Sequence, residues 1–505
     1  MISKNNRSHK KIMIYLLIFL CIFMFPTVKV QASSDVIQNN NSGMPDKNLY
    51  KAILKQMGKK SNQKFTKQEA AQLKTLHAGH CKIKSLKGIQ YLQNLRELVL
   101  EGNGLKNLKG IQSLTKLKSL YISNNKIKSL KPLKKLKNLR VLEAEWNEIK
   151  SLKGVENLTK LKTLDLYINR VESVKELKNL INLTTINLDR NNLKSLKGFG
   201  KQKKLKVLSM KENKLMGIKE LKGLKSLEYL DISVNEIRSL KGLPKSKKLT
   251  QLFVNRNKLT GIQEVKKLVN LEDLLVNENE LTSLQGIGTL KKLKTLQAKS
   301  NRLSSLAGVS ILKKLETLSV DSNQLVNIDE VVSLKKLDGL GISFNKITKL
   351  PNLSSHSNLS VVRFRFNQLG ESLEEIKRKL PKNCFLYGEN WIDEEYSFQK
   401  LDYSINFVKP EAAELIHSGT TRIAGHIYMP AEKIQLHVEE NWNDDDDFST
   451  YYYADVNENG DFVFENLDLK KYAGKRCDIR IGICYEYDKE RHSYIDTSMR
   501  WYRVK

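Results

Sequence analysis

The sequence predicts a solenoid of short parallel strands that is followed by a small all-β domain. Three observations support this prediction. An Asn recurs every 22 residues from Asn103 to Asn367, thirteen times, without an insertion or deletion. Apolar side chains keep a fixed register around each of these Asn residues. Residues 401–505 break the repeat and reverse the charge, with 13 basic and 20 acidic side chains in a chain whose net charge is +32.

The composition excludes several other classes of protein. A chain that is 40% hydrophobic, with only 8 Pro among 505 residues, is neither disordered nor collagen-like. Its 5 Cys show no zinc-finger spacing and are too few for a disulfide scaffold. We therefore expect a folded protein with no metal centre and no cofactor.

Residues 1–32 have the layout of a secretory signal peptide. Four basic residues precede an apolar run over 12–25, and Val30-Gln31-Ala32 supplies small residues for cleavage after Ala32. An uncleaved anchor helix is the alternative, but this run is shorter than the ~20 apolar residues that span a bilayer. We expect cleavage and secretion to the extracellular space.

Residues 33–75 are predicted to form a helical N-terminal cap. A solenoid exposes its core at both ends, so each end must be covered. Pro45-Asp46 introduces one helical pattern, and the motif Thr66-x-x-Glu69 is typical of a capping box that opens a second helix.

Residues 76–370 match the pattern L-x-x-L-x-L-x-x-N-x-L, which is the leucine-rich repeat. Around Asn125, Leu120 and Ile122 alternate and therefore point inward from a short strand, which we expect on the concave face. The later leucines recur every three residues, which favours a 3₁₀ or extended return on the convex side. The recurring Asn should be buried at the turn, with its amide bonded to the backbone of adjacent coils.

Three coils depart from this pattern on the convex side. Gln202, Ser246 and His356 replace the leucine eleven residues after the Asn. Because a polar side chain fills an apolar position there, we expect these coils to be looser than their neighbours.

The remaining sequence predicts a cap, a linker and a β-sandwich. Residues 371–400 form the cap and linker, with a helical stretch that Pro381 ends. In residues 401–505 apolar side chains alternate in about seven short runs, which fits a sandwich of immunoglobulin type. The segment Asn457 to Asp461 lies between two such runs and is interpreted as a hairpin turn.

This organisation resembles the internalins, secreted leucine-rich-repeat proteins of Gram-positive bacteria. The motif Thr421-x-Ile423-x-Gly425 and the run Asp455 to Phe462 look like a bacterial immunoglobulin-like domain. The resemblance implies that the concave repeat face binds a host or surface protein and that the terminal domain braces the repeats. The chain carries no Leu-Pro-x-Thr-Gly sorting signal, so it is similar to the freely secreted members of the family.

The concave face is predicted from the register as the positions six, four, two and one before each Asn. These 52 positions hold eleven acidic and six basic side chains, so the face is acidic within a basic chain. Lysines concentrate instead in the turns and convex returns, as in Lys126, Lys128, Lys131, Lys134, Lys135 and Lys137. Exposed aromatic side chains often anchor protein interfaces. The candidate partner-binding residues are the acids and aromatics Tyr121, Glu143, Glu145, Trp146, Asp165, Tyr167, Asp189, Tyr229, Asp231 and Phe253.

Trp146, the clustered carboxylates and one Asp-containing motif each have an alternative interpretation. Trp146 is adjacent to the Asn and could simply pack on the rim of the coil. Glu143, Glu145 and Asp165 raise the question of acid–base catalysis, but an open face implies no pocket that excludes water, so no enzyme is predicted. Asp455-x-Asn457-x-Asn459 resembles a calcium loop but is better explained as a β-turn.

The sequence thus predicts a secreted, monomeric recognition or adhesion protein that binds a protein partner, such as a host-cell surface protein, through its concave face. The alternative is a surface-retained protein whose Lys-rich convex side binds cell-wall polyanions. Nucleic acid is not expected as a partner, because no aromatic stacking platform accompanies the lysines.

Overall fold

The computed structural model describes residues 35–387 and six later segments: 405–406, 423–427, 433–440, 449–455, 461–468 and 477–484. The predicted signal peptide and most of the linker before residue 401 lie outside these residues. Among the described residues, no helix is both long and apolar enough to span a membrane.

Two short helices and a two-stranded sheet precede the first coil. Strand β1 (Val36–Ile37) pairs antiparallel with β2 (Phe65–Thr66), and the helices are α2 (Lys47–Gln56) and α3 (Lys67–Gln72). The capping box is present at the start of α3, where the Thr66 side chain accepts from the backbone N–H of Glu69 at 3.2 Å.

Asp46 links helix α2 to the first coil. Its Oδ1 accepts hydrogen bonds from the backbone N–H groups of Asn48 and Leu49, both at 3.0 Å, and so caps the helix. Its Oδ2 accepts from the backbone N–H groups of Lys84 at 2.7 Å and Ser85 at 2.9 Å. One carboxylate therefore satisfies the helix end and the turn that opens the repeats.

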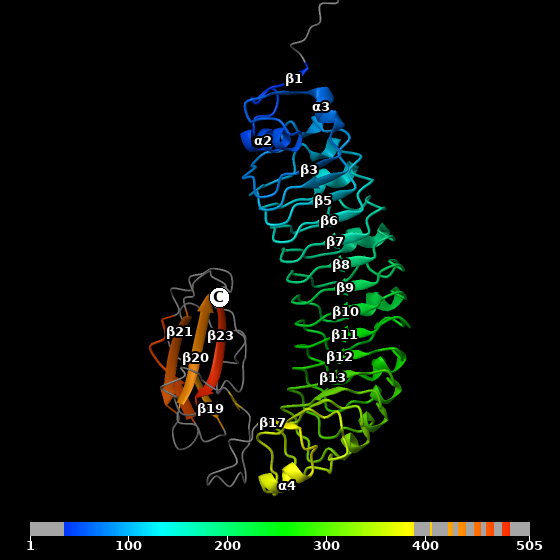
Figure 1. Ribbon diagram of the computed structural model, residues 1–505, viewed down its shortest axis with the longest axis vertical. Helices are drawn as coiled ribbons and strands as arrows, with labels where there is room; N and C mark the ends of the chain where they lie inside the picture. Colours follow the sequence, from blue (N-terminus) through cyan, green and yellow to red (C-terminus); the bar gives the residue numbers. More distant parts are fainter. Residues whose placement is uncertain are drawn as a thin grey trace, which may run out of the picture. The chain divides into compact units, whose positions relative to one another are not determined.

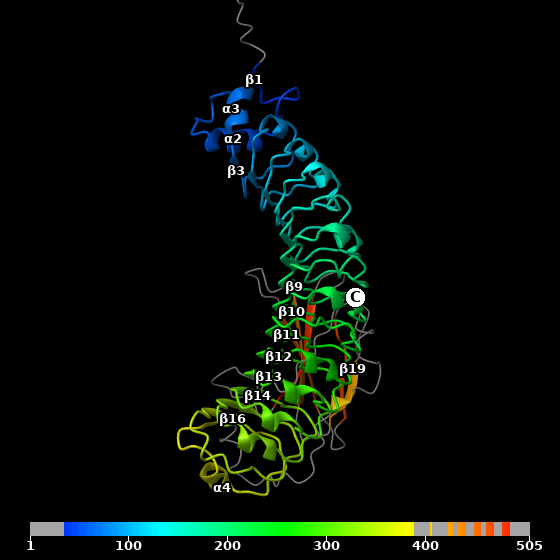
Figure 2. The same ribbon diagram turned by 90° about the vertical axis from the view of Figure 1, so that its right-hand side faces the viewer.

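Within the described residues, one sheet of 15 strands runs through the repeats, and each strand lies beside its neighbours in the chain (Figures 1 and 2). The pairs from β3 to β15 are parallel, and each residue lies opposite the residue 22 positions away, as Glu143 does with Asp165. The strands are β3 (Thr75–His77), β4 (Glu97–Val99), β5 (Ser119–Tyr121), β6 (Val141–Glu143), β7 (Thr163–Asp165), β8 (Thr185–Asn187), β9 (Val207–Ser209), β10 (Tyr229–Asp231), β11 (Gln251–Phe253), β12 (Asp273–Leu275), β13 (Thr295–Gln297), β14 (Thr317–Ser319), β15 (Gly339–Gly341), β16 (Val361–Arg363) and β17 (Phe385–Tyr387).

The return segments are 3₁₀-helices or extended chain, as the three-residue spacing of the leucines predicted. Leu130, Leu133 and Leu136 in one such return are fully buried. At Gly154 the backbone is left-handed (φ 111), and a Cβ there would collide with the carbonyl of Leu130 in the preceding coil, so only glycine fits. The described 3₁₀-helices are η1 (Ile89–Tyr91), η2 (Ile111–Ser113), η3 (Lys131–Lys135), η4 (Lys175–Asn179), η5 (Lys219–Gly223), η6 (Gln263–Lys267), η7 (Ile287–Thr289), η8 (Val309–Ile311) and η9 (Asp329–Ser333).

The recurring Asn residues form a buried ladder, which confirms the prediction. Asn191 is 7% exposed, and its Nδ2 donates to the carbonyl oxygens of Leu166 (2.9 Å), Leu188 (3.1 Å) and Asp189 (3.0 Å). Its Oδ1 accepts from the backbone N–H of Val171 at 2.8 Å. Each ladder Asn thereby satisfies backbone groups of its own coil and of the coil before it.

The residue before each ladder Asn has a left-handed backbone, and nearly all of these residues are not glycine. The φ angle is 51 at Trp146, 50 at Ile168 and 55 at Val234. An L-residue is disfavoured in this conformation, and a β-branched residue most of all. The conformation is retained because the carbonyl oxygen of this residue accepts a hydrogen bond from the backbone N–H of the ladder Asn in the preceding coil. For example, Asn125 N–H donates to Trp146 O at 3.2 Å.

In the three coils that carry a polar residue in place of leucine, the polar side chain is buried and fills the position of the leucine. Gln202, Ser246 and His356 are at most 1% exposed. Gln202 Nε2 donates to the carbonyl oxygen of Leu177 at 2.7 Å, and Ser246 Oγ donates to that of Leu227 at 2.7 Å. Each side chain thus bonds to backbone of the coil before it, although Gln202 Oε1 and His356 Nδ1 are buried without a hydrogen-bond partner, and looser packing of these coils stays a prediction.

Beyond the repeats, helix α4 (Leu373–Arg378) lies within the predicted C-terminal cap segment, and further strands follow. The described strands form two antiparallel three-stranded sheets, in the orders β18-β19-β22 and β21-β20-β23. Their bounds are β18 (Ile405–Asn406), β19 (Ile423–Ile427), β20 (Lys433–Glu440), β21 (Ser449–Asp455), β22 (Asp461–Phe464) and β23 (Cys477–Cys484).

The predicted hairpin around Asn457 is wrong, because the strands that flank it, β21 and β22, belong to different sheets. The turn residues 456–460 lie outside the described residues. The immunoglobulin-like sandwich stays a prediction.

Candidate functional site

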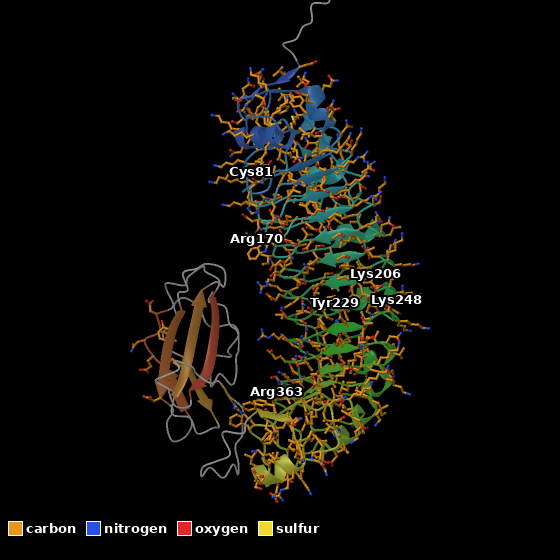
Figure 3. All side chains as sticks on the ribbon, viewed as in Figure 1. Cys81, Arg170, Lys206, Tyr229, Lys248 and Arg363 are labelled. Atoms are coloured by element: carbon orange, nitrogen blue, oxygen red, sulfur yellow. The ribbon has the colours of Figure 1, made fainter. Side chains whose placement is uncertain are left out.

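The strand face is the surface formed by side chains six, four, two and one positions before each ladder Asn. In Figure 3, Tyr229 lies on the strands, Arg170 lies on the flank that follows the ladder, and Lys206 and Lys248 lie on the opposite flank. The strands bring the ten predicted contact residues into two groups. The first group is Tyr121, Glu143, Glu145, Trp146, Asp165 and Tyr167, and the second is Asp189, Tyr229, Asp231 and Phe253.

The first group contains a cluster of carboxylates. Glu143 pairs with Asp165 across strands β6 and β7, and the side chains of Glu145 and Asp165 are hydrogen-bonded to each other. Desolvation first, and then the charge of Asp165, raises the pKa of Glu145 to about 7. Desolvation, with the charges of Asp165 and Glu101, also raises the pKa of Glu143. Just below pH 7 Glu145 therefore keeps a proton that an isolated glutamate would have lost.

Asp165 is the best-anchored member of this cluster. Its Oδ1 accepts from the backbone N–H of Tyr167 at 2.9 Å, and its Oδ2 accepts from Asn187 Nδ2 at 3.1 Å. No Lys, Arg or His in the described part of the chain lies within ion-pair distance of Glu101, Glu143, Glu145 or Asp165. The negative charge of the cluster is thus left without a basic partner within the fold.

An aromatic pair borders the carboxylates. The rings of Trp146 and Tyr167 meet edge to face, with centroids 6.2 Å apart and planes at 82°. Trp146 projects from the left-handed turn and is 39% exposed. Arg190 lies over the other side, with its Cζ 5.9 Å from the centre of the Tyr167 ring and its Nε 2.9 Å from Glu212. Tyr167 is therefore held from both sides, whereas the Trp146 ring is open to a partner.

The second group is held mainly by internal contacts. Asp189 accepts from Ser209 Oγ at 2.6 Å and from the backbone N–H of Lys211 at 2.7 Å. Burial above all, with the charge of Asp231, raises the pKa of Asp189 to about 6. Asp231 is only 9% exposed and accepts from the backbone N–H of Ser233. These two carboxylates are less available to a partner than those of the first group.

Tyr229 and Phe253 complete the second group. Their ring centroids lie 5.4 Å apart with planes at 86°, an edge-to-face contact like that of the first group. Burial and the neighbouring Asp231 raise the pKa of the Tyr229 hydroxyl, so the phenol stays neutral and can donate to that carboxylate.

The sequence register placed three further residues on this face but did not identify them as contact residues. Arg190, Asn187 and Ser209 each contact a predicted residue, through the Tyr167 ring, Asp165 and Asp189 respectively. The 22-residue register places each of them in an outward position of the next coil, so a two-dimensional arrangement of the repeats would have identified them. In the described residues, no group of three or more His, Cys, Asp or Glu side chains is arranged to hold a metal ion.

Three family models match the repeats. Residues 115–157, 181–237 and 221–301 each match a model described as leucine-rich repeats. No curated protein matches the sequence. The sequence and fold are similar to those of a leucine-rich-repeat protein of Leptospira interrogans, at 31% identity and a TM-score of 0.56, over 61% of this chain and 81% of that one.

Two internalins of Listeria monocytogenes share the fold. Internalin InlF is 24% identical with a TM-score of 0.57, over 68% of this chain and 94% of that one. The functional domain of InlJ, which includes a cysteine ladder, is 18% identical with a TM-score of 0.56, over 87% of this chain and 94% of that one. These structures match the succession of coils and the long parallel sheet described above.

Proposed function

We propose that this chain, which belongs to the leucine-rich-repeat family, is a secreted recognition protein that binds a protein partner through its strand face. Such families are typically non-enzymatic scaffolds for protein interaction, and nothing in the described residues points to catalysis. The observation that carries the proposal is the exposed Trp146 ring beside carboxylates that have no basic partner within the described fold.

The partner that this surface fits is basic and partly apolar. A Lys or Arg placed beside Glu145 and Asp165 would lower the raised pKa of Glu145, so binding would release a proton from Glu145. An apolar group against Trp146 would bury a large ring that is otherwise exposed to solvent. Buried Trp and Tyr side chains commonly contribute most of the binding energy of an interface. A surface protein of a host cell is the partner that the resemblance to internalins favours.

Secretion is supported by the amino-terminal sequence. The basic residues, the apolar run over 12–25 and the small residues before Ser33 are the elements that a signal peptidase recognises. Amino-terminal sequencing of protein from the culture medium should begin at Ser33, and a product that keeps Met1 in the membrane fraction would contradict secretion.

Differential capture tests the binding surface. The immobilised secreted chain is exposed to solubilised surface proteins of candidate host cells, beside the variant Trp146→Ala/Tyr167→Ala and the control variant Val326→Ala. Val326 is 50% exposed but lies outside the strand face, so its loss changes apolar exposure without touching the site. We expect a protein that the wild type and the control retain and the double variant loses. Equal capture by all three chains would place the binding site elsewhere.

A further inference from the structure

Two columns of basic side chains run along the flank that follows the ladder. Cys81, 22 residues before Asn103, occupies the ladder position of the first coil. The two columns lie three and six residues after each ladder position in the first eight coils, from Lys84 and Lys87 to Arg238 and Lys241. Of these sixteen positions fourteen are Lys or Arg, and the exceptions are Glu172 and Met216. All sixteen side chains are exposed. We call these sixteen positions the basic ridge.

The ridge ends abruptly. In the five coils after Lys241 the same columns hold no Lys or Arg and instead carry Thr, Ser, Val, Gln, Ala, Asp and Pro, beginning with Thr260 and Gln263. Other columns of these later coils keep their lysines, for example Lys291 and Lys292. If the ridge lysines served only to keep this flank soluble, the same columns should carry lysine in the later coils too, because the fold of the coils does not change.

The backbone under the ridge is fixed. Ser Oγ accepts the N–H of the ridge lysine two residues later, at 3.3 Å from Ser129 to Lys131 and at 3.3 Å from Ser151 to Lys153. Coils of a parallel sheet repeat at ~4.8 Å, so eight coils span roughly 34 Å. Like charges stacked at this separation repel one another, and the repulsion falls when an anion lies along them.

The fold neutralises little of this charge. Lys128 Nζ lies 3.6 Å from Glu148, and Lys87 Nζ donates to the backbone carbonyl of Asn41 at 2.7 Å. No other ridge Lys or Arg has a carboxylate of the described residues within ion-pair distance. Apart from Lys87 and Lys128, the ridge therefore presents a line of positive charges without a carboxylate partner in the described residues.

We propose that the basic ridge binds a linear polymer of phosphate groups, laid along the coils. Lysine ammonium groups are rotatable point charges, which suit a flexible chain of anions better than a single planar ligand. The ridge has no aromatic side chain on which a base or a sugar ring could stack and no carboxamide that could bond to hydroxyl groups. It therefore recognises a ligand through the ligand's negative charges. This site lies on a different surface from the strand face and does not depend on the protein partner proposed above.

The test compares two variants of equal charge in the full secreted chain. Lys109→Gln/Lys131→Gln/Lys153→Gln/Lys175→Gln removes four ridge lysines, and Lys266→Gln/Lys267→Gln/Lys291→Gln/Lys292→Gln removes four exposed lysines from later coils. The probe is inorganic polyphosphate of several lengths, measured by titration over a range of salt concentrations. Because all eight side chains are exposed, thermal unfolding should show that both variants fold as the wild type does.

We expect the ridge variant to lose ~10-fold or more in affinity at moderate salt and the control variant to change by less than ~2-fold. The slope of log affinity against log salt should fall by about 3 in the ridge variant, since each lost contact removes roughly 0.7 for a single-stranded polyanion. Affinity should rise with polymer length until the chain covers roughly 34 Å and rise little beyond that.

Further probes distinguish the sources of the polymer. Poly(glycerol phosphate) binding as well as polyphosphate assigns the site to cell-wall polymers, and polyphosphate alone assigns it to a free polymer. Equal losses in the two variants would mean that the polymer responds to the total charge of the protein and not to the ridge, and tighter binding of heparin or single-stranded DNA would assign another class of ligand. Either of these results would overturn the proposal. Trp146→Ala/Tyr167→Ala should bind polyphosphate as the wild type does, so the two proposals fail separately.

Discussion

The earlier and later coils share one backbone but balance the charge of the strand face in different ways. In the earlier coils Glu145 and Asp165 have no described basic partner, and burial together with the charge of Asp165 raises the pKa of Glu145. In the later coils acids meet bases, since Arg256 Nε lies 2.8 Å from Glu278 Oε2 and Lys299 Nζ lies 3.9 Å from Asp321 Oδ2. In the earlier coils such a pair is present at Arg190 and Glu212, but not at Glu143, Glu145 or Asp165. The ladder and the leucine core are the same in both regions.

This difference shows that the fold does not determine the charge of the outward side chains. Because buried Asn and Leu fix every coil, outward positions can carry any charge at a modest cost in stability. A charge that the fold does not neutralise is then a candidate for neutralisation by a ligand. The unpaired acids and the basic ridge both belong to the earlier coils, so both proposed binding surfaces lie in that half of the repeats.

The largest expected effect comes from removing a residue of the Asn ladder, which both regions share. Asn191→Leu and Asn323→Leu should each lower the free energy of unfolding by about 3 kcal/mol, because each leaves buried backbone donors and acceptors unpaired. Asn323 Nδ2 donates to Ala298 O at 2.9 Å and Val320 O at 3.0 Å, and its Oδ1 accepts from Leu303 N–H at 2.9 Å. Urea unfolding measures both changes. Unchanged stability in either variant would show that the ladder does not hold that region.

The next effect concerns binding. Once a partner is identified, Trp146→Ala and Tyr167→Ala should each weaken its binding by about 2 kcal/mol, because truncation removes a large buried ring at the interface. Phe344→Ala, which removes a ring of the later coils that stacks on Phe366 at 4.4 Å, should leave affinity nearly unchanged. Titration calorimetry at constant pH and salt measures all three. A larger loss with Phe344→Ala would move the site to the later coils.

The third effect depends on pH. The folded pKa of Glu145, about 7, lies above its ordinary value, so the folded protein binds the proton more tightly than the unfolded chain does. The contribution of Glu145 to stability should therefore be fully present below pH ~4.5 and fall as pH rises toward ~7. Glu145→Gln should remove this fall and stabilise the protein above pH 7 by about 1 kcal/mol, a figure reduced for solvent screening.

The matched variant in the later coils is Glu278→Gln, which removes the partner of Arg256. It should cost between 0 and about 1 kcal/mol above pH 7, the opposite sign to Glu145→Gln. Urea unfolding at pH 4.5 and pH 8 distinguishes the two. If Glu145→Gln lowered stability at pH 8, the carboxylate would be a stabilising contact and the contrast between the regions would fail.

Much of the fold could be predicted from the sequence because the repeat fixes it. The strand register, the buried Asn and the 3₁₀ returns all follow from side-chain spacing, and Thr66 and Glu69 identified a helix start. The grouping of Glu143, Glu145 and Asp165 also follows from the 22-residue offset. What spacing could not supply is orientation, so it did not separate the buried Asp231 and the internally hydrogen-bonded Asp189 from the acids of the first group.

Two other features could not be predicted because they depend on neighbouring coils. The burial of Gln202 and Ser246 needs carbonyl acceptors in the coil before, which a pattern of apolar positions does not reveal. The left-handed turn before each Asn carries no glycine signal, since Ile168 and Val234 occupy it. Its cause is the hydrogen-bonded stack itself, and that stack forms only when many coils are present.

The smallest expected effect tests this left-handed turn. Val234 is β-branched with φ 55, whereas Ser300 occupies the same position of a later coil with φ 52. Asn tolerates this conformation better than other side chains, as it does at Asn124 with φ 54. Val234→Asn should therefore raise the free energy of unfolding by about 0.5–1 kcal/mol, and Ser300→Asn should raise it less, because Ser is not β-branched. Parallel urea unfolding of the two variants measures the difference. If Val234→Asn destabilised the protein while Ser300→Asn did not, apolar contacts of the Val side chain would outweigh its backbone strain.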